Sequence, residues 1–228
     1  MAENRPEPEA GLIRDGVLGG TGTLEEMRKL APDGMLRDME GHTVLPGFID
    51  GHSHLSAVAY QLLVANLKPS PLGPCNCVED VVRELKGFLE THSLRPGQWL
   101  MGMGYDNSVF PEGAHPTKED LDRVSTEIPV AAAHISGHLC VVNTKGMELL
   151  GYTGEHFKVP QGGVVEPAGL LKEQAFLGKN GEMQGPAPEE VVKAVGDASK
   201  LYASYGLTTV HDGTVPEGQS QPLQGAAA

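Results

Sequence analysis

The segment 44-VLPGFIDGHSHL-55 joins a short apolar run to an acid and to two histidines that one residue separates. The apolar run over residues 44–49 predicts a buried strand, since short continuous apolar runs are typical of strands covered on both faces. Side chains alternate between the two faces of a strand, so Asp50, His52 and His54 would point the same way if the segment stays extended. Three polar groups are therefore expected to converge on one spot.

Two imidazoles that converge in this way can share one cation. Neutral imidazole is the commonest metal-binding side chain, and histidines at i and i+2 on a strand present two nitrogens to the same ion. A bare pair of this kind is also a frequent surface or turn feature. The apolar run before the pair favours the metal site, as do the small residues Gly51 and Ser53, which leave space for a ligand.

Hydrophobic periodicity indicates helices and strands along the rest of the chain. Thr23 and Glu26 have the spacing of a capping box, which predicts the start of a helix. A long helical pattern, Gly206 and a β-branched strand follow one another near the end, an order typical of α/β barrels. The helices are expected at residues 23–30, 56–67, 78–89, 146–150 and 188–205 and from residue 117, and the strands at residues 99–105, 129–135 and 207–210.

Four ordered stretches carry a resemblance to a known family. "LPGFIDGHSHL" resembles the first-strand signature of the metal-dependent amidohydrolase superfamily. The stretch 99–153, which begins "WLMGMGYDNSVF", together with "GGVVEPAGLLKEQAF" (162–176) and "ASYGLTTVHDG" (203–213), resembles its YtcJ-like branch, amidohydrolase family 3, which includes formamide deformylases. The similarity extends from about residue 36 to about residue 214, and it corresponds to the N-terminal portion of the family only.

The resemblance implies an α/β fold that contains part of a (β/α)8 TIM barrel. The histidine-bearing segment would be the first barrel strand and residues 207–210 the second, with an α/β insertion between them that forms a lid over the active site. A complete barrel takes about 250 residues, so a truncated chain is expected. The expected divisions are a disordered leader with a remnant of an N-terminal β-sandwich at residues 1–43, the first barrel strands with the inserted lid at 44–214, and a disordered tail at 215–228.

The same resemblance implies a divalent metal, zinc in most members, as one or two ions. His52 and His54 would be its ligands in this chain. The further ligands of the family, two histidines and an aspartate that also shuttles the proton, would lie beyond residue 228. Because that general base is missing, low activity or none is expected from this chain alone, together with weak metal binding.

Two other residues are candidates for a catalytic role. Glu173 matches a family position and would be a bridging carboxylate, or Lys172 beside it would be carbamylated; a Glu on an exposed helix face is an equally good interpretation. His211 follows the strand at 207–210, at the carboxyl end where the active sites of barrels gather. It is a candidate for a pocket residue or for a metal ligand.

Three more residues are expected to line the substrate pocket or to support the metal ligands. Asp50 would orient an imidazole through its free N–H, since such carboxylates commonly accompany metal-binding histidines. Asp106 and His138 each follow an apolar strand, although a buried structural histidine explains His138 equally well. No function is assigned to the remaining histidines, which are His42, His92, His115, His134 and His156.

Composition limits the expected partners and location of the chain. With 30 acidic against 17 basic residues and a formal charge of −13, it lacks the basic surface that nucleic acids and anionic membranes attract. No apolar run is long enough for a transmembrane helix, and residues 1–11 do not resemble a signal peptide. Cys75, Cys77 and Cys140 are too few for a disulfide framework. The cytoplasm is the expected location, and association into oligomers is left open.

These observations favour a metal-dependent hydrolase that acts on small-molecule amides, at carbon–nitrogen bonds other than peptide bonds. Two alternatives stay open. One is a non-catalytic metal-binding or interaction fragment of an amidohydrolase. The other is a complete small α/β domain of another function, whose histidines are structural; metal content distinguishes it from the first two.

Overall fold

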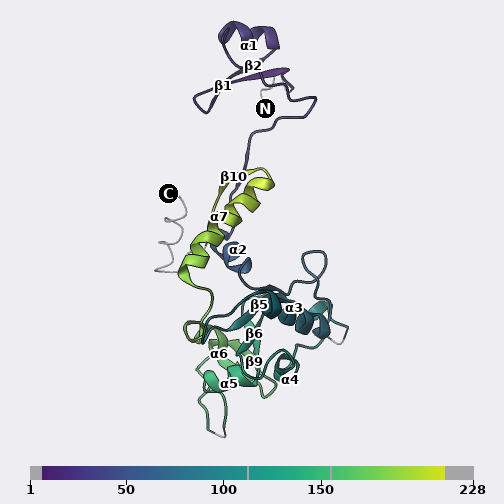
Figure 1. The fold of residues 1–228 in the computed structure, drawn as a ribbon, viewed down its shortest axis with the longest axis vertical. Coiled ribbons are helices and arrows are strands. Elements are labelled where there is room, and N and C mark those ends of the chain that lie inside the picture. The colour runs from purple at the N-terminus through teal and green to yellow at the C-terminus, as the bar shows by residue number, and fades with distance from the viewer. Residues whose placement is uncertain (1–6, 112, 155, 214–228) are drawn as a thin grey trace. The chain divides into compact units, whose positions relative to one another are not determined.

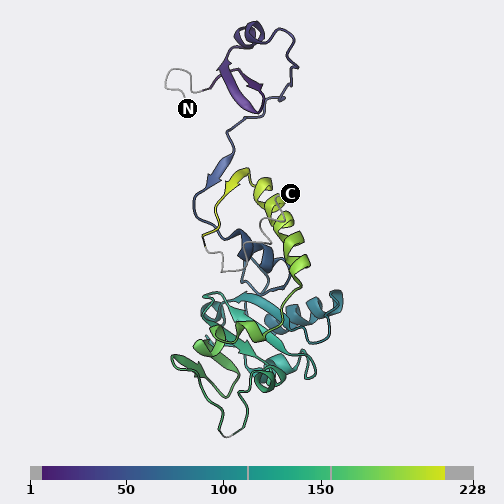
Figure 2. The same ribbon diagram turned by 90° about the vertical axis from the view of Figure 1, so that its left-hand side faces the viewer.

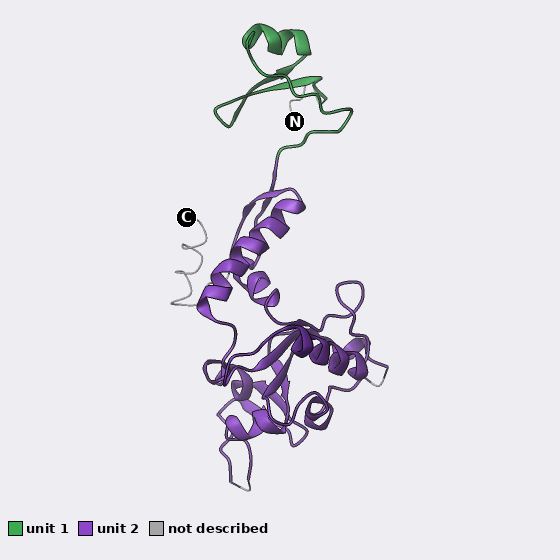
Figure 3. Cartoon of the chain, viewed as in Figure 1, with its two compact units in different colours: residues 1–46 green, residues 47–228 purple. Residues whose placement is uncertain are grey.

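The computed structural model describes residues 7–111, 113–154 and 156–213 (Figure 1). The chain divides into two compact units, Met1–Pro46 and Gly47–Ala228 (Figure 3). The tail predicted at residues 215–228 and residues 1–6 of the predicted leader lie outside the described residues.

The first unit contains a β-hairpin. Strand β1 (Ala10–Arg14) pairs antiparallel with β2 (Val17–Gly22). Asp15 and Gly16 connect them, with φ angles of 52° and 76°. Two successive residues with positive φ are typical of the tight turns that suit the twist of a hairpin. Strands β1 and β2 lie within residues 1–43, where the sequence predicts a leader and a remnant of a β-sandwich.

A short helix, α1 (Leu24–Leu30), follows the hairpin. The side chain of Thr23 accepts the backbone N–H of Glu26, and the side chain of Glu26 accepts the backbone N–H of Thr23. These reciprocal bonds confirm the predicted capping box, which satisfies donors that have no partner within the helix.

A six-stranded mixed sheet belongs to the second unit (Figure 2). In spatial order its strands are β4 (Ala65–Asn66), β5 (Leu100–Tyr105), β6 (Val130–His134), β7 (Leu139–Val142), β9 (Leu170–Glu173) and β8 (Gly163–Val165). The first three strands run parallel, whereas β7 is antiparallel to β6 and to β9, and β8 is antiparallel to β9. The carboxyl ends of β4, β5, β6 and β9 therefore meet at one edge of the sheet, with the amino ends of β7 and β8.

Helices cover both faces of this sheet. They are α3 (Val78–Thr91), α4 (Lys118–Asp122), α5 (Thr144–Leu149) and α6 (Gln174–Leu177), with the 3-10 helices η1 (Asn107–Val109) and η2 (Asn180–Glu182). One face of the sheet buries Val81 and Leu85 of α3 and Leu121 of α4. The other face buries Met147 of α5 and Phe176 of α6. Strand β6 lies between these two cores and is buried on both faces, as its apolar sequence predicts.

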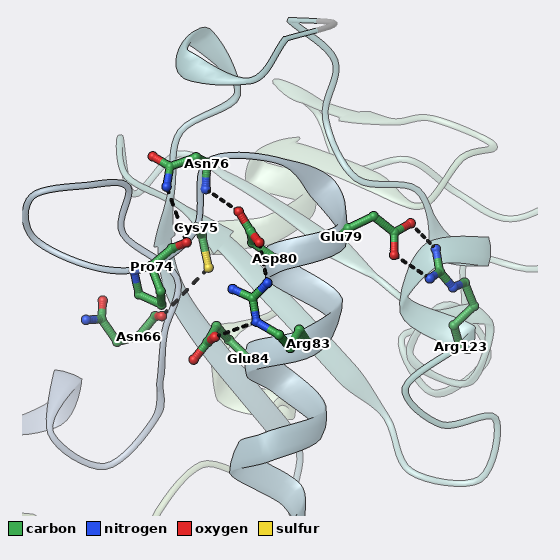
Figure 4. A network of polar contacts seen from close by, with 9 residues as sticks. All are labelled: Asn66, Pro74, Cys75, Asn76, Glu79, Asp80, Arg83, Glu84 and Arg123. Carbon is green, nitrogen blue, oxygen red and sulfur yellow. Dashed lines mark hydrogen bonds and ion pairs between the residues drawn. The ribbon is translucent and has the colours of Figure 1, made fainter.

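A network of polar contacts fixes the start of α3 (Figure 4). The backbone N–H of Asn76 donates to Asp80 over 2.9 Å, which lowers the pKa of the Asp80 carboxyl. Arg83 pairs with the same carboxylate one turn further along. Two guanidinium nitrogens of Arg123 donate to the two carboxylate oxygens of Glu79, each over 2.6 Å. This bidentate pair joins the end of α4 to the first turn of α3.

Two further strands and two helices form a second group within this unit. Strand β3 (Phe48–Asp50) pairs parallel with β10 (Leu207–Val210). Helix α7 (Pro188–Ser204) lies beside β10 (Figure 2) and ends before Gly206, whose φ of 81° suits the predicted helix stop. Helix α7 packs on α2 (Leu55–Gln61) through a cluster of small buried residues, which are Ala59, Ala194, Val195 and Ala198.

The prediction of a buried strand at residues 44–49 is wrong. Strand β3 contains only the end of this run, and the side chains of Val44, Leu45 and Ile49 are 66%, 61% and 74% exposed. Among the described residues β3 has one hydrogen-bonded neighbour, β10. A strand that is buried on both faces needs a continuous sheet and covering layers, so apolar character alone does not bury this one.

The helix predicted at residues 56–67 is also shorter than expected. Helix α2 ends at Gln61, and Ala65 and Asn66 form β4 by pairing with Gly102 and Met103 of β5. Pairing with a distant strand overrides the helical periodicity of this segment. The predicted helices α1, α3, α4, α5 and α7 and the predicted strands β5, β6 and β10 are confirmed to within about two residues. Strands β7, β8 and β9 and helix α6 were not predicted.

Within the described ranges, no helix combines the length and the apolar character that crossing a bilayer requires. Cys75, Cys77 and Cys140 are free thiols, as the sequence predicts.

Asn143 is fully buried and satisfies four backbone groups. Its Oδ1 accepts the N–H groups of Val130 at 3.0 Å and Gly146 at 2.8 Å. Its Nδ2 donates to the carbonyls of Ser125 at 2.7 Å and Ile128 at 2.9 Å. This one side chain therefore ties together the start of β6, the first turn of α5 and the loop that precedes β6.

The substitution Asn143→Ala should lower the free energy of unfolding by about 3 kcal/mol, because two buried N–H groups lose their acceptor and each costs ~1–3 kcal/mol. Urea denaturation followed by circular dichroism measures the change. Asn180→Ala, at an exposed position in η2, is the control and should change the value by less than about 0.5 kcal/mol. Equal small effects of the two substitutions would contradict the prediction.

Candidate functional site

The two predicted metal ligands lie just past the end of β3. The strand stops at Asp50, residues 51 and 52 form a bend, and His54 makes an isolated β-bridge with Asp212. The segment is therefore not the extended strand that the sequence predicted. Both imidazoles are nevertheless exposed, and their ring centroids lie 5.3 Å apart with an interplanar angle of 87°.

Gly213 borders the space between the two rings. A β-carbon built on Gly213 would lie 3.3 Å from Cε1 of His54 and 3.6 Å from Cε1 of His52. The Cε1 atoms of both rings therefore lie near one common point beside Gly213. Whether the two imidazoles bind one ion stays a prediction.

Asp50 shapes the bend that carries the first histidine. Its carboxylate accepts the backbone N–H of His52 at 3.1 Å, and its carbonyl accepts the backbone N–H of His211 at 3.2 Å. In this structure Asp50 thus accepts hydrogen bonds from the backbone of the loop. Its predicted contact with an imidazole N–H stays a prediction.

His211 lies at the same end of the paired strands as the two predicted ligands. Since β3 and β10 are parallel, their carboxyl ends meet at one edge, and His211 directly follows β10. Its side chain is exposed. The predicted role of His211 in a pocket stays a prediction.

Sequence reasoning did not single out Asp212. Its Oδ2 accepts the backbone N–H of Ser56 at 2.8 Å and so caps α2, whose own N-cap residue, His54, provides no side-chain hydrogen bond. The contact spans 156 residues of the chain. No local sequence signal predicts a cap from that distance.

The described residues fit part of a metal shell. His52 and His54 would supply two nitrogen ligands, whereas a catalytic zinc normally has three protein ligands and one open position. Among the residues that the structure describes, no group of three or more His, Cys, Asp or Glu side chains could hold an ion. Metal binding by His52 and His54 stays a prediction.

A second set of predicted site residues gathers at the carboxyl edge of the six-stranded sheet. Asp106 follows β5, His138 precedes β7 and Glu173 ends β9. The strand directions place all three at this edge. In open α/β sheets, ligands bind beyond the carboxyl ends of the strands, so the position agrees with the predicted pocket role without testing it.

His138 and Glu173 contact each other directly. Nδ1 of His138 lies 3.0 Å from Oε2 of Glu173, and the backbone N–H of Glu173 donates to the carbonyl of His138 at 2.9 Å. Glu173 is the last residue of a strand and not part of an exposed helix face. Its φ of 50° is uncommon for any residue but glycine. Within the described part of the chain it forms no ion-binding group with His52 and His54.

Lys172 and Asp106 are both engaged in local contacts. Nζ of Lys172 pairs with Glu166 at 2.6 Å, an ion pair that carbamylation of the amine would remove. Oδ1 of Asp106 accepts the hydroxyl of Ser108 at 2.6 Å and its backbone N–H at 2.9 Å, which begins η1. These hydrogen bonds lower the pKa of the Asp106 carboxyl. Neither contact tests the roles predicted for these residues.

Tyr105, His115 and His134 form a cluster that sequence reasoning missed. Oη of Tyr105 lies 2.9 Å from Nδ1 of His115, and the ring of His134 has its centroid 5.1 Å from that of Tyr105 and 5.8 Å from that of His115. The backbone N–H of Ser136 donates to Nδ1 of His134 at 3.1 Å. The proton of the neutral His134 ring is therefore on Nε2, which is buried without a hydrogen-bond partner among the described residues.

Burial lowers the pKa values of His115 and His134 below the ordinary value of 6.5. In the unfolded chain both rings take up a proton as the pH falls through about 6.5, whereas in the folded chain they stay neutral to lower pH. The unfolded state then binds more protons in this range. Their contribution to stability is therefore present above about pH 6.5 and is lost as the pH falls toward the folded pKa values.

The substitution His134→Phe should make stability less sensitive to acid. Urea denaturation of the wild-type and variant chains between about pH 7.5 and pH 5.5, the range that brackets the ordinary imidazole pKa, measures the slope. His156→Phe, at an exposed position, is the control. An unchanged slope in His134→Phe would show that this ring does not carry the effect.

A cavity of about 410 Å³ lies between α2, α7 and the strands β4 and β5. Its lining is mainly apolar and includes Tyr202, but none of the site residues predicted from the sequence. The cavity is therefore separate from the two polar regions described above.

The sequence of this chain is similar to a known protein family and to several known proteins. The amidohydrolase family matches residues 36–228. An N-substituted formamide deformylase of Arthrobacter pascens is 33% identical over 218 residues, which are 91% of this chain and 39% of that protein. The putative amidohydrolase YtcJ of Bacillus subtilis (strain 168) is 28% identical over 216 residues, or 91% of this chain and 37% of that protein. The chain thus spans less than half the length of these relatives.

Solved structures of similar fold are metal-dependent hydrolases. An uncharacterized metal-dependent hydrolase from Pyrococcus horikoshii OT3 has a TM-score of 0.65 and 22% identity, covering 94% of this chain and 41% of that one. A second, from Pyrococcus furiosus, has a TM-score of 0.61 and the same identity, covering 93% and 42%. At this identity the likeness shows a shared mixed α/β fold.

Proposed function

The chain belongs to the amidohydrolase family, and from this membership we propose that it takes part in the metal-dependent hydrolysis of carbon–nitrogen bonds other than peptide bonds. The observation that carries the proposal is the proximity of His52 and His54, whose exposed rings lie 5.3 Å apart and both approach Gly213. Both rings follow the bend after β3 and are exposed, which supports the proposal that an ion can reach them.

His52 and His54 would hold a divalent cation, and zinc is the proposed ion because it accepts imidazole ligands in sites that keep an open position. When bound, such a cation polarises a carbonyl group and makes hydroxide available near neutral pH. The residues of this chain supply the ligand geometry: Asp50 holds the backbone of His52, and His211 stands at the same edge.

The fold supports a more detailed proposal. Strands β3 and β10 are proposed as the first two strands of a (β/α)8 barrel, since they pair in parallel and their carboxyl ends carry the candidate ligands. The six-stranded sheet lies between them in sequence and is proposed as the insertion that forms the lid. The hairpin and α1 are proposed as part of a β-sandwich.

The proposed substrate is a small amide. The Arthrobacter relative is named for N-substituted formamides, which have the type of bond that this chemistry cleaves. His138 and Glu173 are proposed to face substrate, because they meet at the sheet edge where α/β folds bind ligands. The acidic balance of the chain disfavours a nucleic-acid partner. Cytoplasmic location and association into oligomers stay predictions.

A second candidate function is metal binding without catalysis. It is favoured by one observation: within the described residues, no third ligand joins the two imidazoles. Each missing ligand weakens an ion's binding and leaves the site less well ordered. Binding and turnover therefore have to be measured separately.

We expect the chain to bind one Co²⁺ ion, used as a spectroscopic probe for the zinc site, with modest affinity. The double variant His52→Ala with His54→Ala should raise the dissociation constant at least about tenfold, which corresponds to ~1.4 kcal/mol. Isothermal titration calorimetry measures it. The matched control, His42→Ala with His156→Ala, removes two exposed imidazoles elsewhere and should leave the affinity unchanged. Equal losses in both double variants would mean that binding is non-specific.

We expect slow hydrolysis or none when the zinc-loaded chain is given N-methylformamide, because His52 and His54 are fewer ligands than a catalytic zinc normally has. Release of formate measures turnover. Turnover that disappears in His52→Ala would support the hydrolase. Specific metal binding without any turnover would favour the second candidate.

A further inference from the structure

His52 and His54 lie outside the sheet, so regular strand geometry does not fix the relative orientation of their rings. Strand β3 ends at Asp50, and past the bend the pairing with the end of β10 is reduced to the single bridge between His54 and Asp212. A loop of this kind has more freedom than a strand inside a sheet. Other contacts must therefore fix the residue that stands between the two imidazoles.

That residue is Ser53, and it is held at two points. Its side chain is buried between two exposed neighbours, with a relative exposure of 8%. Its carbonyl accepts the backbone N–H of Gly213 at 2.7 Å. Its hydroxyl forms a hydrogen bond with the phenol of Tyr202, 149 residues further along the chain. Any rotation of the backbone at Ser53 changes the relative directions of His52 and His54.

Tyr202 can hold Ser53 in place because the helix that carries Tyr202 is itself packed against α2. Helix α7 packs on α2 through Ala194, Val195 and Ala198, all of which are buried. Tyr202 lies one turn beyond Ala198 and is partly buried, so its phenol is positioned by the packed part of the helix. The phenol meets the loop at Ser53, the buried member of the triplet.

We propose that Tyr202 is a positioning residue that sets the geometry of His52 and His54 through its hydrogen bond with Ser53. The inference rests on the proposed metal site and deepens it. Removing the phenol hydroxyl leaves Ser53 with one anchor, at Gly213, and lets the loop sample several directions. The imidazoles then meet an ion in the right arrangement for only part of the time, which weakens binding in proportion.

The test compares Tyr202→Phe with Tyr205→Phe, which removes the same hydroxyl from an exposed tyrosine three residues along. Tyr202→Phe should raise the Co²⁺ dissociation constant about three- to tenfold and change the visible absorption of the saturated complex, because ligand geometry sets both. Tyr205→Phe should change neither. A merely structural role of the hydroxyl would move the urea midpoint but not the spectrum at saturation.

A double-mutant cycle tests the route through Ser53. Ser53→Ala should reproduce the effect of Tyr202→Phe, and the combined variant should be no worse than either single one. Additive losses would show that Tyr202 acts by another path and would overturn the inference. So would a wild-type affinity and spectrum in Tyr202→Phe.

NMR spectra of the metal-free chain show whether the positioning role of Tyr202 holds even if the proposed metal site does not. In ¹H–¹⁵N spectra, Tyr202→Phe should shift the ring signals of His52 and His54, and Tyr205→Phe should not. If the wild type binds no Co²⁺ but these signals still shift, the proposed metal site fails and the positioning role stands. Unshifted signals overturn the positioning role whatever the metal does.

Discussion

The parallel pairing of β3 with β10 is the constraint on which the candidate site depends. Asp50 and Val210 are partners in this ladder, which places residues near position 50 beside residues near position 210. The ladder is short and its outer side chains are exposed, so its hydrogen bonds alone give it little strength. The packing of α7 on α2 brings the same two segments together and supplies buried apolar surface that the strands lack.

The sequence predicted the candidate ligands but not what holds them. His52 and His54 are recognisable because chemistry-bearing residue types recur at a fixed short spacing next to small residues. The contacts of Tyr202 with Ser53 and of Asp212 with Ser56 join positions about 150 residues apart. Local patterns contain no information about such pairs, so only the folded chain shows which polar side chain meets which loop.

The same difference between local and distant information explains which parts of the fold could be predicted from the sequence. Helices α3 and α7 were predictable because a long apolar stripe and its end signals lie within one segment. Residues 44–49 and 65–66 were not, since their state depends on which strand pairs with them. His115 and His134 are a similar case: a loop residue and a strand-end residue form a partly buried cluster because Tyr105 lies beside both.

Glu173 closes a strand with a backbone conformation that glycine adopts far more readily. Such a conformation costs on the order of 1–3 kcal/mol in a residue that has a β-carbon. A change to glycine at this position would relieve that cost but would also remove the carboxylate. The hydrogen bond between this carboxylate and the ring of His138 therefore forms at a backbone position that does not favour glutamate.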